Sequence, residues 1–75
     1  MINIKNVTSK QVIKIMKKLW FIEFHKKWSH IQMKKWFYRI TIPDHWNKTL
    51  NIKTLYSIIK QSNLTIDEFL ENIDE

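Results

Sequence analysis

The 75-residue chain contains no glycine and no cysteine, and it has a single proline. Without cysteine, disulfide bonds and thiolate zinc sites are excluded. Without glycine, a phosphate-binding glycine-rich loop cannot form, which excludes the nucleotide-hydrolysing folds that depend on one. No apolar run approaches the roughly 18 residues that span a membrane, and the first ten residues lack a signal-peptide pattern. We therefore expect a soluble, cytoplasmic protein that contacts no membrane.

The length favours one small domain over residues 1–75, because the chain has no linker, repeat or low-complexity segment. A core of this size supplies about 3–5 kcal/mol of stability at most. A stabilising partner protein would therefore be useful to such a chain.

Acidic residues are scarce in most of the chain. Residues 1–66 contain all 13 basic residues but only Glu23 and Asp44 as acids, which gives a formal charge of +11. The other five acids lie in the last nine residues. A basic body attracts a polyanion such as RNA, although a lysine-rich solvated surface would have the same composition.

Helical periodicity predicts three helices. Val7-Thr8-Ser9-Lys10-Gln11 has a capping threonine and its glutamine partner, and it starts a helix over residues 9–19. Apolar residues at helical spacing predict a second helix over residues 52–61. Thr65 and Glu68 form a second capping box, which starts a short C-terminal helix.

Between the first two helices, three segments alternate between apolar and polar residues: 21–26, 30–34 and 37–42. Period two with β-branched and aromatic residues predicts half-buried strands, and the short connections predict an antiparallel meander that ends at Pro43. The fold class is therefore α+β: a two-layer α-β-β-β-α sandwich with both main helices on one face of the sheet. This layout is similar to that of double-stranded-RNA-binding domains.

The alternation assigns side chains to the two faces of the sheet. The face away from the helices is expected to present Glu23, His25, His30, Gln32, Arg39 and Thr41. Ile22 and Phe24 are expected on the buried face, and the phenylalanines of the strands are interpreted as core residues rather than as platforms for nucleic-acid bases.

His30 is the candidate for chemistry. An imidazole can take a proton from a ribose 2′-hydroxyl or give one to a leaving 5′-oxygen, and a nearby cation can stabilise the negative charge that develops on the phosphate. Taken alone, a single strand histidine is more often an ordinary exposed residue. The three histidines have no metal-ligand spacing, so no metal site and no cofactor are predicted.

Five short motifs, in order, resemble the HicA toxins, the small RNA-cleaving toxins of bacterial toxin–antitoxin pairs. They are the first helix, Lys26-Lys27-Trp28-Ser29-His30, the Thr-Ile-Pro of residues 41–43, His45, and the Thr-Leu-Tyr-Ser-Ile-Ile-Lys-Gln of residues 54–61. The resemblance covers about residues 8–71. It implies a fold similar to double-stranded-RNA-binding domains, mRNA cleavage through His30, and a HicB-like antitoxin as partner.

The chain departs from the family pattern in one systematic way. Trp20, Trp28 and Trp46 stand where the family has glycine, and Trp36 stands at a turn where glycine would be expected. Lys53 and Asn63 replace further frequent glycines, and His25 stands where arginine is common. An average composition of about 7% glycine predicts roughly five in a chain of this length. We hypothesise that the source reads UGA codons as glycine and that these codons are translated here as tryptophan.

The leading hypothesis is therefore a metal-independent mRNA endoribonuclease toxin with His30 as general base and acid. Candidate RNA contacts are Lys26, Lys27, Ser29, Lys34 and Arg39. Ser29 is interpreted as a positioning residue, because no base accompanies it as a nucleophile would require. The alternatives are a non-catalytic double-stranded-RNA-binding module, an inactive HicA-like remnant, and a protein-interaction domain for an acidic partner.

Overall fold

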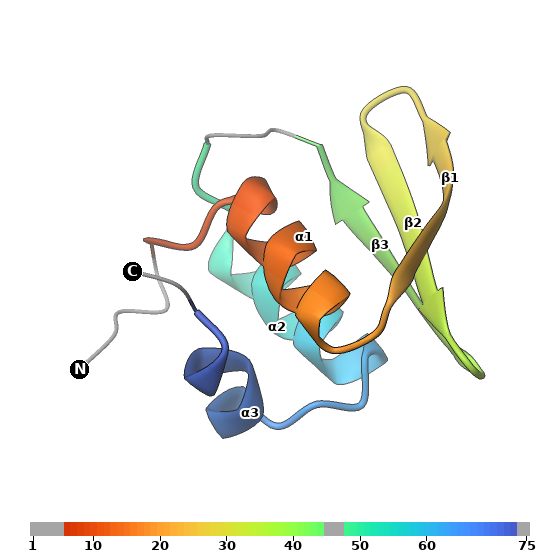
Figure 1. Cartoon of the computed structure of the whole chain (residues 1–75). Helices are drawn as coiled ribbons and strands as arrows, with labels where there is room; N and C mark the ends of the chain where they lie inside the picture. The colour runs from red at the N-terminus through yellow and green to blue at the C-terminus, as the bar shows by residue number, and fades with distance from the viewer. Residues whose placement is uncertain (1–5, 45–47, 74–75) are drawn as a thin grey trace.

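A computed structural model describes residues 6–44 and 48–73 of the chain and gives an α+β fold (Figure 1). The elements follow the order α1 (Ser9–Lys18), β1 (Ile22–Lys27), β2 (His30–Lys35), β3 (Tyr38–Pro43), α2 (Ile52–Gln61) and α3 (Ile66–Glu71). The strands form one antiparallel sheet in the order β1-β2-β3. Helices α1 and α2 lie side by side on one face of this sheet, as predicted, and α3 is the expected short C-terminal helix.

The helices begin where the sequence predicts. At α1, the Thr8 side chain accepts a hydrogen bond from the Gln11 backbone, and the Gln11 side chain accepts one from the Thr8 backbone. Thr65 and Glu68 form the same reciprocal box at α3. Each box satisfies backbone N–H groups that the first turn of a helix leaves without partners. Asn51, which was not predicted, caps α2.

The core lies between the helices and the inner face of the sheet. Ile31, Met33, Ile40 and Ile42 project from β2 and β3 and are almost fully buried. They pack in one cluster with buried residues of the helices and flanking segments, which include Val12, Ile15, Met16, Phe21, Leu55, Ile58, Ile59 and Phe69. Burial of an aliphatic side chain stabilises a fold by about 1.5–3 kcal/mol. This cluster therefore determines which face of the sheet is buried and which face stays open to solvent.

The first strand does not follow the predicted alternation. Glu23 pairs with Met33 and His25 pairs with Gln32, so one residue, Phe24, is extra on β1. Such a β-bulge reverses the faces of the residues that precede it. Ile22, 65% exposed, and Phe24, 39% exposed, are therefore outside the core, and their predicted burial is wrong. The predicted place of Glu23 is also wrong, because it shares the helix side of the sheet with Met33.

The three tryptophans within the described residues all have a left-handed backbone. Trp20, Trp28 and Trp36 have φ angles of 75°, 59° and 55°. Non-glycine residues are rare in this region, and bulky ones are strained there. Their side chains are 79%, 87% and 81% exposed, so no packing of the indoles explains these conformations. Trp46, the fourth tryptophan of the prediction, lies outside the described residues, as does His45.

Each of these positions lies in a motif that favours glycine. At the end of α1, the Trp20 N–H donates to the Lys17 carbonyl and the Phe21 N–H donates to the Met16 carbonyl. These are the two bonds of a Schellman motif, whose left-handed residue is usually glycine. Trp28 and Trp36 are each the first residue of a two-residue hairpin loop, and only this first residue has a positive φ. This is the φ pattern of a type II′ turn, which usually has glycine at that position.

Candidate functional site

The outer face of the sheet forms the candidate site. The strand residues that point away from the helices, which we call the open face, include His25, Lys27, His30, Gln32, Lys34, Arg39 and Thr41. Their positions follow from the register, because paired residues share a face and the inner-face partners are buried. The described strands place five basic or histidine side chains on this face and no acidic one, since the bulge removes Glu23.

Around His30 the open face is hollowed. A shallow hollow of about 300 Å³ is lined by His25, Lys27, Trp28, Ser29, His30, Gln32 and Thr41. We call it the His30 hollow. Of the predicted site residues it brings together His30, Lys27 and Ser29, and it adds His25. Two imidazoles and an ammonium group therefore line one opening, a combination that suits proton transfer beside a phosphate.

Both neighbouring strands hold the backbone around His30 in place. His30 is the first residue of β2, and it pairs with Lys27 of β1 and Pro43 of β3. The Asp44 N–H donates a 2.6 Å hydrogen bond to the Ser29 carbonyl, which joins the end of β3 to the β1–β2 turn. Ser29 is thus tied through its backbone to the end of β3, next to His30.

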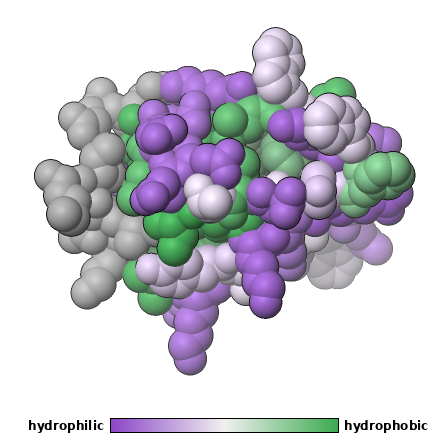
Figure 2. Space-filling view, turned by 90° about the horizontal axis from the view of Figure 1, so that it is seen from below, coloured by the Kyte–Doolittle hydropathy of each residue, from purple (hydrophilic) through white to green (hydrophobic). Residues whose placement is uncertain are grey.

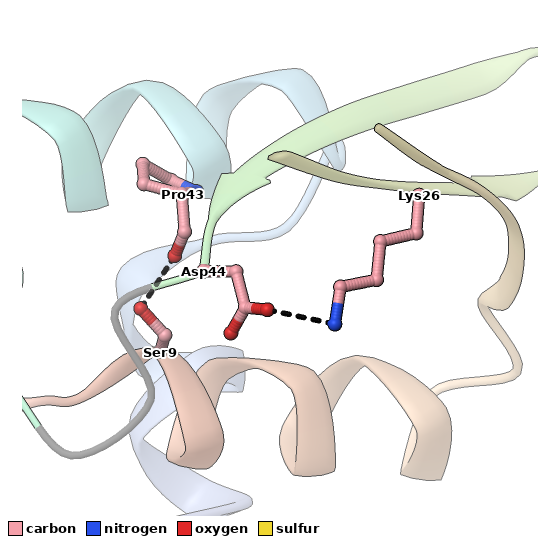
Figure 3. A network of polar contacts seen from close by, with 4 residues as sticks. All are labelled: Ser9, Lys26, Pro43 and Asp44. Carbon is pink, nitrogen blue, oxygen red and sulfur yellow. Dashed lines mark hydrogen bonds and ion pairs between the residues drawn. The ribbon is translucent and has the colours of Figure 1, made fainter. Parts of the chain in front are cut away.

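Lys26 lies away from the other predicted RNA contacts. It pairs with the buried Ile31, which places it on the helix side, and its Nζ lies 3.0 Å from the Asp44 Oδ2 (Figure 3). The hydrogen bond to Asp44, and then the Coulomb attraction to that carboxylate, raise the pKa of Lys26 above its ordinary value. Nearby, the buried Ser9 hydroxyl donates a 2.6 Å hydrogen bond to the Pro43 carbonyl. Lys26 therefore joins β1 to the residue that follows β3, beside the site.

Lys34 and Arg39 gather at the other end of the open face. They are direct partners across β2 and β3, and both cations lie over the ring of Phe24: the Lys34 Nζ at 5.1 Å and the Arg39 Cζ at 5.8 Å from its centre. Sequence reasoning missed Phe24, because its place in an alternating segment indicated burial. No signal in the sequence marks the bulge that exposes it.

Among residues 6–44 and 48–73, no group of three histidine, cysteine or acidic side chains is arranged to hold a metal ion. No helix in those residues is long and apolar enough to span a bilayer.

The fold and the site together define a small α+β protein with helices on one face of an antiparallel sheet and a cationic, histidine-bearing opposite face. A family model described as the HicA toxin of bacterial toxin–antitoxin matches residues 9–64. Because this match covers most of the 75 residues, the chain belongs to the HicA toxin family. Neither the comparison with curated proteins nor that with solved structures gave a significant match.

Proposed function

We propose that this toxin is an endoribonuclease that cleaves mRNA and that His30 carries the chemistry. The observation that supports this most is the His30 hollow, in which His25, Lys27 and His30 line one opening on a face without acidic strand residues. A polyanion is attracted to such a face, and the hollow supplies the groups that transesterification of RNA requires.

The proposed reaction uses only side chains of this chain. One imidazole takes the proton of a ribose 2′-hydroxyl, and the 2′-oxygen forms a bond to the adjacent phosphorus. The bond from phosphorus to the 5′-oxygen then breaks, and a protonated imidazole gives its proton to that oxygen. We assign both transfers to His30. A protonated His25 is the other imidazole in the hollow that could give the proton to the 5′-oxygen. Lys27 stabilises the charge that builds on the phosphate. The products are a 2′,3′-cyclic phosphate and a 5′-hydroxyl, with no metal or cofactor involved.

A HicB-like antitoxin is the proposed partner, and the cytoplasm, where mRNA is translated, is the proposed location. Membership of a toxin family supports the existence of an antitoxin. A protein that neutralises the toxin has to cover the His30 hollow or hold the toxin away from RNA. The open face is the surface to which this partner would bind.

The test compares the chain with His30→Ala and His30→Gln, where glutamine keeps a polar side chain but cannot transfer protons. All three are built with glycine at positions 20, 28, 36 and 46. Induction of the parent should arrest growth and degrade transcripts. Both variants should lose these effects while keeping the thermal unfolding transition and binding to the antitoxin. Continued toxicity of the two His30 variants would overturn the role of His30.

The arrangement of helices on one face of a three-stranded antiparallel sheet also favours a second candidate, a non-catalytic module that binds double-stranded RNA by shape. That module would bind duplex RNA with a strong dependence on salt and would cleave neither duplex nor single-stranded RNA. Cleavage by the parent chain excludes it.

A further inference from the structure

We propose that Phe24, Lys34 and Arg39, which we call the Phe24 cluster, form a second RNA-binding site that holds a nucleotide away from the cleaved bond. This inference rests on the proposed function, since it takes the same RNA strand as its ligand. It differs in location and in chemistry, because it binds a base and a phosphate and transfers no proton.

The first support is an unfavourable pair of charges. Lys34 and Arg39 are direct cross-strand partners, and like charges in this position repel each other. The described strands offer no acidic side chain on the open face to compensate them. An anion placed between the two cations would remove the repulsion. A phosphate suits this position because arginine can bind it through two N–H groups and lysine as a point charge.

The second support is the exposed ring. The β-bulge places Phe24 beside the two cations, with 39% of the residue accessible, although a phenylalanine of this strand would be expected in the core. The cation–π contacts fix the charges close to the ring without covering it completely. An aromatic surface beside fixed cations is the combination with which proteins bind single-stranded nucleic acid, because every base can stack on a ring.

The third support is the shape of the surface. A hollow of about 390 Å³ borders the two cations of the cluster: Lys34 and Arg39 line it with Ile22, Lys35, Trp20 and Trp36, while Phe24 lies outside its lining. Figure 2 views the molecule from below, and pale and green side chains project there among hydrophilic ones at the end where β2 and β3 meet in Figure 1. The surface beside Lys34 and Arg39 is thus hollowed and mixed in polarity, which leaves room for a phosphate and its sugar next to the two cations.

The spacing to His30 defines the ligand. Lys34 is four residues from His30 on β2 and on the same face, which separates them by about 14 Å along the strand. One single-stranded RNA can therefore contact both places at once, with the scissile phosphate in the His30 hollow and a nucleotide further along the chain at the Phe24 cluster. A duplex would keep its bases stacked inside and could not offer one to Phe24.

The experiment measures binding of fluorescein-labelled single-stranded RNA to the full chain carrying His30→Ala, which prevents cleavage. Adding Phe24→Ala should weaken binding of an eight-nucleotide RNA about fivefold or more, and Phe24→Tyr should restore it. Lys34→Ala with Arg39→Ala should also reduce the slope of log affinity against log salt. The control is Phe37→Ala, because Phe37 is 97% exposed at the β2–β3 turn and lies outside the cluster. It should leave binding unchanged.

Two further controls make the result specific. A two-nucleotide RNA is too short to reach from His30 to the cluster, so the chain with His30 intact should cleave it equally well with Phe24 and with Phe24→Ala. The series is repeated with glycine at positions 20, 28 and 36, so that exposed indoles cannot supply the stacking. Equal RNA affinity of Phe24→Ala and Phe37→Ala, with unchanged thermal unfolding, would overturn the site. Loss of antitoxin affinity alone would assign the cluster to protein binding and would also overturn it.

The outcome is separable from that of the proposed function. If the parent cleaves RNA but Phe24 does not affect binding, only the second site is wrong. If RNA binding depends on Phe24 but the parent does not cleave RNA, only the catalytic proposal is wrong.

Discussion

Trp20, Trp28 and Trp36 occupy backbone conformations that suit glycine and expose their indoles to solvent. Asn63 provides an internal comparison. It ends α2 with the same pair of hydrogen bonds that surround Trp20, from Asn63 to Lys60 and from Leu64 to Ile59, and its φ is 62°. Asparagine tolerates the left-handed region, whereas a bulky residue there is strained. The hypothesis that these tryptophans stand for glycine thus gains a conformational reason at every described position.

Replacing any one of these three tryptophans by glycine should raise the free energy of unfolding by about 1–2 kcal/mol, because the left-handed backbone carries that cost for a residue with a Cβ atom. Urea denaturation of Trp20→Gly, Trp28→Gly and Trp36→Gly measures the change. The matched variants Trp20→Ala, Trp28→Ala and Trp36→Ala remove the indole but keep the Cβ atom, so they should bring little of this gain. An equal gain from alanine would show that exposure of the indole, and not φ, causes the instability.

The codons provide an independent test of the same hypothesis. UGA at positions 20, 28, 36 and 46 would support recoded glycine. UGG at any of them would count against it. Position 28 also bears on the proposed activity, since Trp28 lines the His30 hollow. Trp28→Gly should therefore open the hollow to RNA.

Lys26 offers a prediction about ionisation. The Asp44 carboxylate raises the pKa of Lys26, so the folded state binds this proton more tightly than the unfolded state does. The ion pair therefore stabilises the fold at neutral pH, and its contribution is lost only as the pH rises through the raised pKa, in strongly alkaline solution. An NMR titration of the Lys26 ammonium should give a pKa above the ordinary lysine value.

Asp44→Asn isolates the charge in this prediction, because it keeps the backbone N–H that donates to Ser29. In this variant the pKa of Lys26 should return toward the ordinary value. An unchanged pKa would mean that Asp44 does not pair with Lys26 in solution.

At the scale of the elements, the sequence predicted the helices and most of the sheet for identifiable reasons. Capping boxes mark the starts of α1 and α3, and Pro43 marks the end of β3. The alternation in β2 and β3 predicted their two faces correctly, because neither strand contains an extra residue. Sequence reasoning therefore placed His30, Gln32, Arg39 and Thr41 on the open face.

Most of the errors lie in β1 and have one cause, and one lies elsewhere, because Phe37 was also assigned to the core and is 97% exposed in the β2–β3 turn. A bulge adds a single residue, and no residue type in Ile22-Glu23-Phe24-His25 marks where that residue is accommodated. The position of the bulge depends on how β1 pairs with β2, and the alternation of apolar and polar residues within β1 carries no information about that pairing. The exposure of Phe24 has the same origin, whereas Lys26 follows the bulge and lies on the helix side, the face that the alternation assigns to it.

The capping box of α1 can be tested at this scale. Thr8→Ala should lower the free energy of unfolding by about 1 kcal/mol, because it leaves the Gln11 N–H without its side-chain acceptor. Thr8→Ser keeps the hydroxyl and should behave as the parent in urea denaturation. Equal loss from both variants would point to packing of the Thr8 methyl group instead of capping.

On the scale of the whole molecule, the two sides of the sheet have separate tasks. The helix side buries the apolar residues that stabilise the fold, and the open face presents His25, Lys27, His30, Lys34 and Arg39 to solvent. This division predicts that His30 can be replaced without loss of the core. With RNA and an antitoxin both proposed to bind the open face, we expect the two to compete for it.

The most direct measurement is the cleavage of a defined single-stranded RNA by the purified, glycine-restored toxin in the presence of EDTA, with analysis of the product ends. We predict cleavage that continues in EDTA, products ending in a 2′,3′-cyclic phosphate and a 5′-hydroxyl, and loss of cleavage in His30→Ala and His30→Gln with unchanged folding. Cleavage that stops in EDTA, or that persists in both folded His30 variants, would contradict it.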